Sequence, residues 1–102
     1  RIFTPAEVRY ADSSESGSAA RLAARFAAKE AVIKVLRPDD QPVPWRDIEV
    51  LRGASGACDV KLTRRAAALA RRAGIHEISV SLTHHGSQAA AVAVGVRSVT
   101  SA

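Results

Sequence analysis

The residues best suited to chemistry are concentrated in one segment, residues 21–34. Lys29, Glu30 and Lys34 lie close together there, and Arg21 and Arg25 precede them at the spacing of one helical turn. Side chains three or four positions apart share one face of a helix, so this segment can present a row of positive charge. Such a row suits phosphate binding, and it is equally compatible with a solvent-exposed face whose ion pairs contribute little to stability.

Lys29 occupies an unusual position within this segment. At about 100° per residue, it falls on the same arc as four apolar side chains, Leu22, Phe26, Ile33 and Leu36. A buried ammonium group is costly unless it is paired, so Lys29 needs a carboxylate, a phosphate or access to solvent. The simplest expectation is that its aliphatic stem lies on apolar surface while its charged head reaches water.

A second group of polar residues follows a predicted strand near the end of the sequence. Thr83, His84 and His85 come at the end of that strand, and a turn is predicted over residues 84–87. Together these residues offer hydroxyl, imidazole and backbone N–H donors, which suit a phosphate. The alternation of the strand points His84 toward the core side, where a lone histidine is more often a packed residue than a ligand.

Helix signals are strongest around the charged segment. Residues 18–37 contain no glycine or proline and many strong helix formers, and Pro38 ends this long helix. A shorter helix is predicted after Thr4, because Thr4 is a good N-cap and Glu7 follows it at the spacing of a capping box. The polar residues 12–17 separate the two helices.

The remaining segments predict one further helix and several strands. Thr63 is the expected N-cap of a helix over residues 64–73, and Gly74 is its expected left-handed C-terminal residue. Alternating hydrophobicity predicts strands at residues 47–51, 59–62, 78–82 and 89–96. This order of elements implies one α+β domain over residues 1–102, in which an antiparallel sheet packs against the long helix.

Composition limits the classes of function. The formal net charge is +5, which favours phosphorylated or acidic partners, nucleic acid among them. Cys58 is the only cysteine, so an intramolecular disulfide is excluded and a reducing cytoplasm is expected. No apolar stretch approaches the roughly 20 residues that span a bilayer. The sequence also contains no Walker loop and no Gly-x-Ser-x-Gly elbow.

Several motifs together resemble the 4'-phosphopantetheinyl transferases, in particular the short holo-acyl-carrier-protein synthases. Residues 25–34, Arg-Phe-Ala-Ala-Lys-Glu-Ala-Val-Ile-Lys, are similar to the family signature Trp/Phe-Ala-x-Lys-Glu-Ala-x-x-Lys. Residues 81–84, Ser-Leu-Thr-His, resemble the family's Ser-x-Ser-His element. Residues 2–7 and 45–50 are similar to its Phe-Thr-x-x-Glu segment and Asp-Ile-Glu-Val strand, and the motifs follow the family's order.

The resemblance implies a metal-assisted phosphoryl transfer. A serine hydroxyl of an acidic acyl carrier protein attacks the β-phosphate of coenzyme A, and 3',5'-ADP is released. The implied metal is Mg²⁺, held by Glu30, and the implied catalytic residues are Glu30 and Lys34. The general base is open between Glu30 and a water molecule polarised by the metal. The coenzyme A phosphates are implied to contact five side chains, Arg25, Lys29, Lys34, Thr83 and His84.

The resemblance also implies features that lie beyond this sequence. Family members begin with a strand carrying a Gly-x-Asp motif, whose aspartate shares the metal with the residue at the Glu30 position. No such motif precedes Arg1 here, so only one of the two expected metal ligands is found in residues 1–102. Short members of the family form trimers with active sites between subunits, and a cytoplasmic homotrimer without membrane contact is therefore expected.

A second class of function stays open on the sequence alone. The chain is also compatible with a basic, non-enzymatic binding module, either a relative without the metal site or a nucleic-acid binder. Its four aromatic residues, Phe3, Tyr10, Phe26 and Trp45, are too sparse to form a stacking platform for single strands. This scarcity weighs against nucleic acid as a partner, although a basic helix in a major groove is not excluded.

Overall fold

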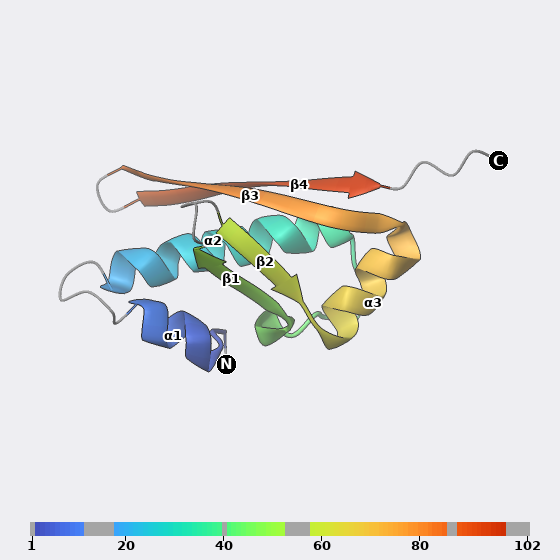
Figure 1. Ribbon diagram of the computed structural model, residues 1–102, viewed down its shortest axis with the longest axis horizontal. Helices are drawn as coiled ribbons and strands as arrows, with labels where there is room; N and C mark the ends of the chain where they lie inside the picture. The colour runs from blue at the N-terminus through green and yellow to red at the C-terminus, as the bar shows by residue number, and fades with distance from the viewer. Residues whose placement is uncertain (1, 12–17, 40, 53–57, 86–87, 98–102) are drawn as a thin grey trace.

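The computed structural model describes residues 2–11, 18–39, 41–52, 58–85 and 88–97, which form an α+β architecture (Figure 1). The elements follow the predicted order. They are α1 (Pro5–Ala11), α2 (Ser18–Leu36), the 3-10 helix η1 (Trp45–Asp47), β1 (Ile48–Arg52), β2 (Cys58–Leu62), α3 (Arg64–Ala73), β3 (Ile75–His85) and β4 (Gln88–Arg97). None of the described helices is long and apolar enough to cross a bilayer.

The strands form two antiparallel pairs rather than one sheet. In the described residues β1 pairs with β2 and β3 pairs with β4, and no ladder joins the two pairs. The helix α2 packs along the β3–β4 pair on one side and contacts β1 and α1 on the other (Figure 1). The predicted packing of antiparallel strands against the long helix is therefore present, with the helix covered from two directions.

This two-sided covering makes the buried face of α2 wider than the predicted arc. Leu36 is buried as the arc predicts, and Phe26 and Ile33 are half-buried. Ala28 and Val32, which lie outside the predicted arc, are fully buried. The arc was predicted from the periodicity of α2 alone, which assumes that one side of the helix is buried, whereas the structure buries α2 from two sides.

Strand β4 lies close to α2 at Gly95. A Cβ atom built on this residue would lie 2.7 Å from Cγ1 of Val35, so a larger residue requires the Val35 side chain, or the elements that carry the two residues, to shift. Gly95 pairs with Ile78 across the β3–β4 ladder. Val35 is therefore level with Ile78 along the hairpin, which fixes the alignment of the helix with the two strands.

The β3–β4 hairpin extends further than its sequence pattern indicates. The strand predicted at residues 78–82 runs over Ile75–His85, and His84 pairs with Ala89. The expectation that the turn begins at His84 is wrong, because the ladder continues through His85. The rest of that predicted turn, residues 86–87, lies outside the described residues.

Candidate functional site

The predicted capping box at the start of α1 is confirmed, and it directs a carboxylate into the core. The hydroxyl of Thr4 accepts the N–H of Glu7 at 3.2 Å, and Oε1 of Glu7 accepts the N–H of Thr4 at 2.8 Å. The other carboxylate oxygen, Oε2, accepts the N–H of Val50 at 2.7 Å. Glu7 is fully buried, so this one side chain ties the start of α1 to strand β1.

Lys29 is the partner of this buried carboxylate. Its Nζ lies 2.9 Å from Oε1 of Glu7, and both side chains are fully buried. The ammonium also donates to the carbonyl oxygens of Trp45, at 3.0 Å, and Ile48. Burial lowers the pKa of Lys29, and the hydrogen bond and charge of Glu7 oppose that shift.

The expectation that Lys29 reaches water is therefore wrong, because Glu7 satisfies its charge inside the protein. The sequence offered three ways to compensate this ammonium, and the carboxylate is the one that the structure contains. The Lys29 head is enclosed by Glu7 and two carbonyl groups, so this conformation does not present it to a phosphate. Glu7 was predicted only as a helix-capping residue, and its second role was missed.

Glu30 and Lys34 lie on a different side of α2 and are both exposed. They are one helical turn apart, so their side chains project from the same face. Within the described part of the chain, neither takes part in a salt bridge, and no such bridge joins them to each other. A carboxylate and an ammonium are thus available together at the surface of the long helix α2.

Glu30 is suited to holding a hard cation only in combination with a ligand. The described residues contain no group of three or more His, Cys, Asp or Glu side chains that converge on one point. Mg²⁺ commonly binds one or two carboxylates and completes its shell with substrate phosphates and water. The donor set at Glu30 therefore fits a magnesium ion shared with a phosphate, and it does not form an all-protein metal cage.

Arg25 is a buried cation whose charge is incompletely compensated. It is 2% exposed, and its Nη1 donates to the carbonyl of Arg21 at 3.2 Å. Its Nε and Nη2 atoms are buried and have no hydrogen-bond acceptor in the structure's described residues. A buried charge without a counter-ion is costly, so these two nitrogens are donors that an anion would satisfy.

Three arginines, Arg21, Arg25 and Arg52, gather around the side chain of Tyr10. The Arg25 guanidinium lies 4.4 Å from the centre of the Tyr10 ring, and the Arg21 guanidinium lies 5.8 Å from it. Nε of Arg52 donates to the Tyr10 hydroxyl at 3.3 Å. This hydrogen bond, with the charges of Arg52 and Arg25, lowers the pKa of Tyr10. Neither Tyr10 nor Arg52 was among the site residues predicted from the sequence.

The structure separates the predicted phosphate ligands into two groups. Arg25 and Lys34 are two and a half helical turns apart, so they project from opposite sides of α2. Ile78 is level with Val35, the neighbour of Lys34 on α2. His84 lies six residues further along β3, so it is about 20 Å from Ile78. Thr83 is exposed, and the His84 side chain lies outside what the structure describes. Within a single copy of the chain, Lys34 is therefore far from Thr83 and His84.

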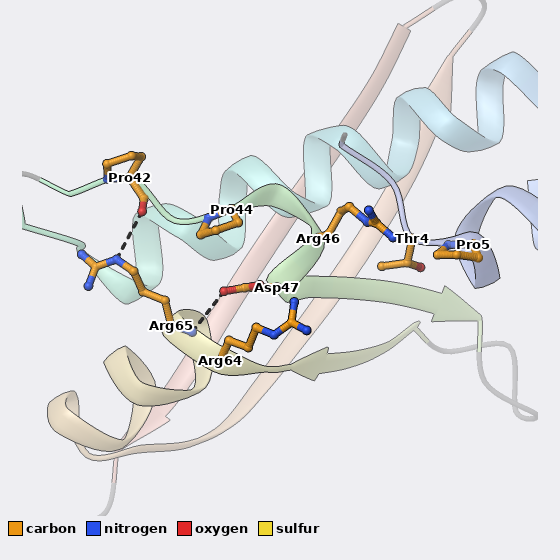
Figure 2. A pocket seen from close by; sticks show the side chains of 8 residues that line it. All are labelled: Thr4, Pro5, Pro42, Pro44, Arg46, Asp47, Arg64 and Arg65. Atoms are coloured by element: carbon orange, nitrogen blue, oxygen red, sulfur yellow. Dashed lines mark hydrogen bonds between the residues drawn. The ribbon is translucent and has the colours of Figure 1, made fainter.

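A hollow of about 700 Å³ opens where the starts of α1 and α3 meet η1 (Figure 2). Its lining residues are Thr4, Pro5, Pro42, Pro44, Arg46, Asp47, Arg64 and Arg65. Asp47 is buried at its base, and Oδ2 accepts the N–H of Arg65 at 3.0 Å. Asp47 thus performs the capping role predicted for Thr63, whose side chain makes no capping hydrogen bond.

Comparison with protein families identifies one matching family. The model described as the 4'-phosphopantetheinyl transferase superfamily matches residues 1–94. The holo-[acyl-carrier-protein] synthase of Moorella thermoacetica is 50% identical over 94 residues, covering 92% of this chain and 73% of the relative. The enzyme of the same name from Desulforudis audaxviator is 44% identical and covers 94% of this chain and 72% of its own length.

Solved structures show the same similarity in three dimensions. The acyl carrier protein synthase of Mycobacterium tuberculosis superposes with a TM-score of 0.73 at 44% identity, covering 95% of this chain and 82% of that one. The Chronobacterium ammoniagenes synthase in complex with coenzyme A gives a TM-score of 0.80 at 30% identity, covering 96% and 79%. Both the order of the elements and their packing are therefore shared with these proteins.

Proposed function

The chain belongs to the 4'-phosphopantetheinyl transferase superfamily, and from this premise we propose that it is a holo-acyl-carrier-protein synthase. Such an enzyme transfers the 4'-phosphopantetheine group of coenzyme A to a serine of an apo acyl carrier protein and releases 3',5'-ADP. The relatives named as holo-[acyl-carrier-protein] synthases match more than nine-tenths of this chain. The relative solved with coenzyme A supports coenzyme A as the donor.

The observation that carries this function is the arrangement of charges on α2. Glu30 and Lys34 are exposed on one face, while Lys29, the residue before Glu30, is held inside by Glu7. Lys34 is placed to neutralise a phosphate of coenzyme A, and Glu30 to hold Mg²⁺. A magnesium ion held there would supply charge stabilisation to a phosphate of the substrate. We assign Lys29 a positioning role, because it fixes α2 against the turn that contains Trp45.

The remaining assignments are compatible with an assembly of several copies. We propose that Arg25, Thr83 and His84 also contact coenzyme A, as the family resemblance implies. Arg25 and Lys34 project from opposite sides of α2, so both groups reach one coenzyme A molecule most directly if neighbouring copies each contribute one group. This geometry supports the expected homotrimer with sites between subunits. A cytoplasmic location is in keeping with the single cysteine.

A binding and transfer experiment tests the proposed function. Calorimetric titration should show binding of coenzyme A and no comparable binding of duplex DNA. Lys34→Ala should weaken coenzyme A by about tenfold or more, because a hydrogen bond to a charged group contributes roughly 1.5–3 kcal/mol. Its melting temperature should stay unchanged, since Lys34 is exposed. Tight DNA binding without a response to coenzyme A supports the basic binding module instead.

Arg25→Met gives an independent test of the proposed anion site. Without ligand, the variant should be as stable as the parent or more stable, because it removes a buried charge that lacks a counter-ion. The rise in melting temperature that coenzyme A produces in the parent should be reduced or lost. Arg9→Met, an exposed change on α1, is the matched control. A large loss of ligand-free stability, with the coenzyme A effect retained, would mean that Arg25 is structural.

A further inference from the structure

We propose that Arg65 is a positioning residue for coenzyme A, because it holds the segment after α2 as one wall of a hollow that takes the pantetheine arm. We call this space the Trp45 hollow, after the tryptophan in its lining. This inference rests on the proposed function and deepens it, since it names the part of the donor that lies here. Arg65 is on α3 and was not among the site residues predicted from the sequence.

The Trp45 hollow has a volume of about 400 Å³ and lies between α2 and the segment that follows it. The apolar residues of its lining are Ile33, Pro38, Pro42, Val43 and Trp45. Asp39 and Gln41 add two polar side chains. Small molecules bind in spaces of this size, where a mainly apolar lining supplies most of the contact and a few polar groups fix the orientation. The Trp45 hollow is therefore suited to a small-molecule substrate.

The Trp45 hollow adjoins the face of α2 that carries the proposed chemistry. Ile33 is three residues after Glu30, so the two side chains are neighbours on the helix surface. The ring of Trp45 lies 5.1 Å from the ring of Phe26, measured between centroids, and Phe26 is four residues before Glu30. The hollow therefore lies beside Glu30, where the proposed function places the attacked phosphate.

The chemistry of the transfer identifies the part of coenzyme A that reaches the Trp45 hollow. The attacked β-phosphate carries the pantetheine arm on one side, and 3',5'-ADP leaves from the other side. The arm is an uncharged chain with two amide groups, which suits apolar walls with occasional polar groups. The nucleotide half carries a further phosphate, which the Asp39 carboxylate in the lining repels. The arm is therefore the better occupant.

Arg65 binds one wall of the Trp45 hollow at three points. Its Nη2 donates to Oδ1 of Asp39 at 2.7 Å and to the Gln41 carbonyl at 2.9 Å. Its Nε donates to the Pro42 carbonyl at 3.2 Å, as Figure 2 shows. All three acceptors belong to residues that line the hollow, so one rigid guanidinium fixes the position of this wall.

Both ends of this contact are held in place. The backbone N–H of Arg65 donates to Oδ2 of Asp47, which is buried at the start of α3 (Figure 2). On the other side, the N–H of Gln41 and the Arg65 side chain lower the pKa of Asp39, so its carboxylate stays charged at neutral pH. Among the described residues, only Arg65 and Arg72 bind residues 38–39 and 41–42 from another element through hydrogen bonds or ion pairs.

The exposure of the Asp39–Arg65 pair decides where its effect is expected. The Arg65 side chain is 26% exposed and that of Asp39 is 48% exposed, and ion pairs at such positions contribute little to stability. Loss of Arg65 leaves the buried core in place and releases the wall of the hollow. Its removal should therefore weaken the ligand in the hollow much more than it lowers the melting temperature.

Arg65→Gln tests the proposal in the 102-residue chain. Glutamine is also a good helix former, but it lacks the guanidinium that reaches all three acceptors. In calorimetric titration, coenzyme A should bind about tenfold more weakly or worse, whereas 3',5'-ADP, which lacks the arm, should change by less than about twofold. Arg65→Lys keeps the charge opposite Asp39 and should restore part of the affinity. Arg71→Gln, exposed on the same helix, is the matched control and should change neither affinity.

Trp45 supplies a spectroscopic signature that a purely structural role of Arg65 would not change. It is the only tryptophan of the chain, and it lines the hollow. Coenzyme A should therefore shift its fluorescence emission, and 3',5'-ADP should not. In Arg65→Gln the same emission change should require about tenfold more coenzyme A, in step with the loss of affinity.

A second variant keeps the test decisive if Arg65→Gln folds poorly. Asp39→Asn changes an exposed residue and leaves the two carbonyl contacts of Arg65, so it should weaken coenzyme A by about threefold at an unchanged melting temperature. Unchanged coenzyme A affinity in the folded variants overturns the proposal. Equal losses for coenzyme A and 3',5'-ADP overturn it too, as does an equal response of Trp45 to both ligands. If the parent protein binds neither ligand, the proposed function itself fails, and this inference fails with it.

Discussion

Glu30→Gln should leave the fold intact and abolish magnesium-dependent transfer of phosphopantetheine. The amide keeps the shape of the side chain and its helix propensity, but it lacks the negative charge that holds a divalent cation. A bound metal contributes several kcal/mol of charge stabilisation, so the transfer rate should fall by at least about 100-fold. Because Glu30 is exposed, the melting temperature should stay within the range of ordinary surface substitutions.

The measurement is the mass gain of an apo carrier protein, followed with and without Mg²⁺. It is best made in two versions, the 102-residue chain and the same chain with a Gly-x-Asp strand placed ahead of Arg1. The family resemblance implies that this aspartate shares the metal with Glu30, so we expect the first version to be much less active than the second. Glu30→Asp provides a control that keeps the charge. Transfer at the parent rate by Glu30→Gln in the longer version would exclude Glu30 as the metal ligand.

The helices were predictable because their signals are local. The capping box at Thr4 and Glu7, the run without glycine or proline before Pro38 and the left-handed end at Gly74 each depend on a few neighbouring residues. The two-sheet arrangement was not predictable in this way. It depends on long-range pairing and on the close approach of Gly95 to Val35, which no short sequence window contains.

The candidate site shows the same division between local and long-range information. Periodicity placed Lys29 among apolar residues and required a partner for it, but only the fold identifies Glu7, 22 positions earlier, as that partner. The motif brought Arg25 and Lys34 into one list of phosphate ligands, whereas helix geometry places them on opposite sides of α2. The capping of α3 by Asp47 and the hollow above it were missed, because they join three separate elements.

Lys29→Met should destabilise the protein by about 3–5 kcal/mol, the usual cost of removing one partner from a buried ion pair. The change leaves the Glu7 carboxylate buried without its counter-ion, and it also removes the hydrogen bonds from Nζ to the carbonyl oxygens of Trp45 and Ile48. Urea denaturation measures this loss directly. Lys34→Met, on the same helix but exposed, is the matched control and should cost less than about 0.5 kcal/mol.

The double variant Lys29→Met and Glu7→Gln distinguishes a lost ion pair from a packing defect. The glutamine removes the unpaired negative charge, and its side-chain oxygen can still accept one of the two N–H groups, of Thr4 and Val50, that Glu7 serves. We therefore expect the double variant to be more stable than the sum of the single losses predicts, by about 1–3 kcal/mol of coupling. Additive losses would mean that the two side chains act independently. Lys29 would then contribute through its hydrogen bonds to the Trp45 and Ile48 carbonyl oxygens and through packing of its stem, and the ion pair with Glu7 would not be what stabilises this part of the fold.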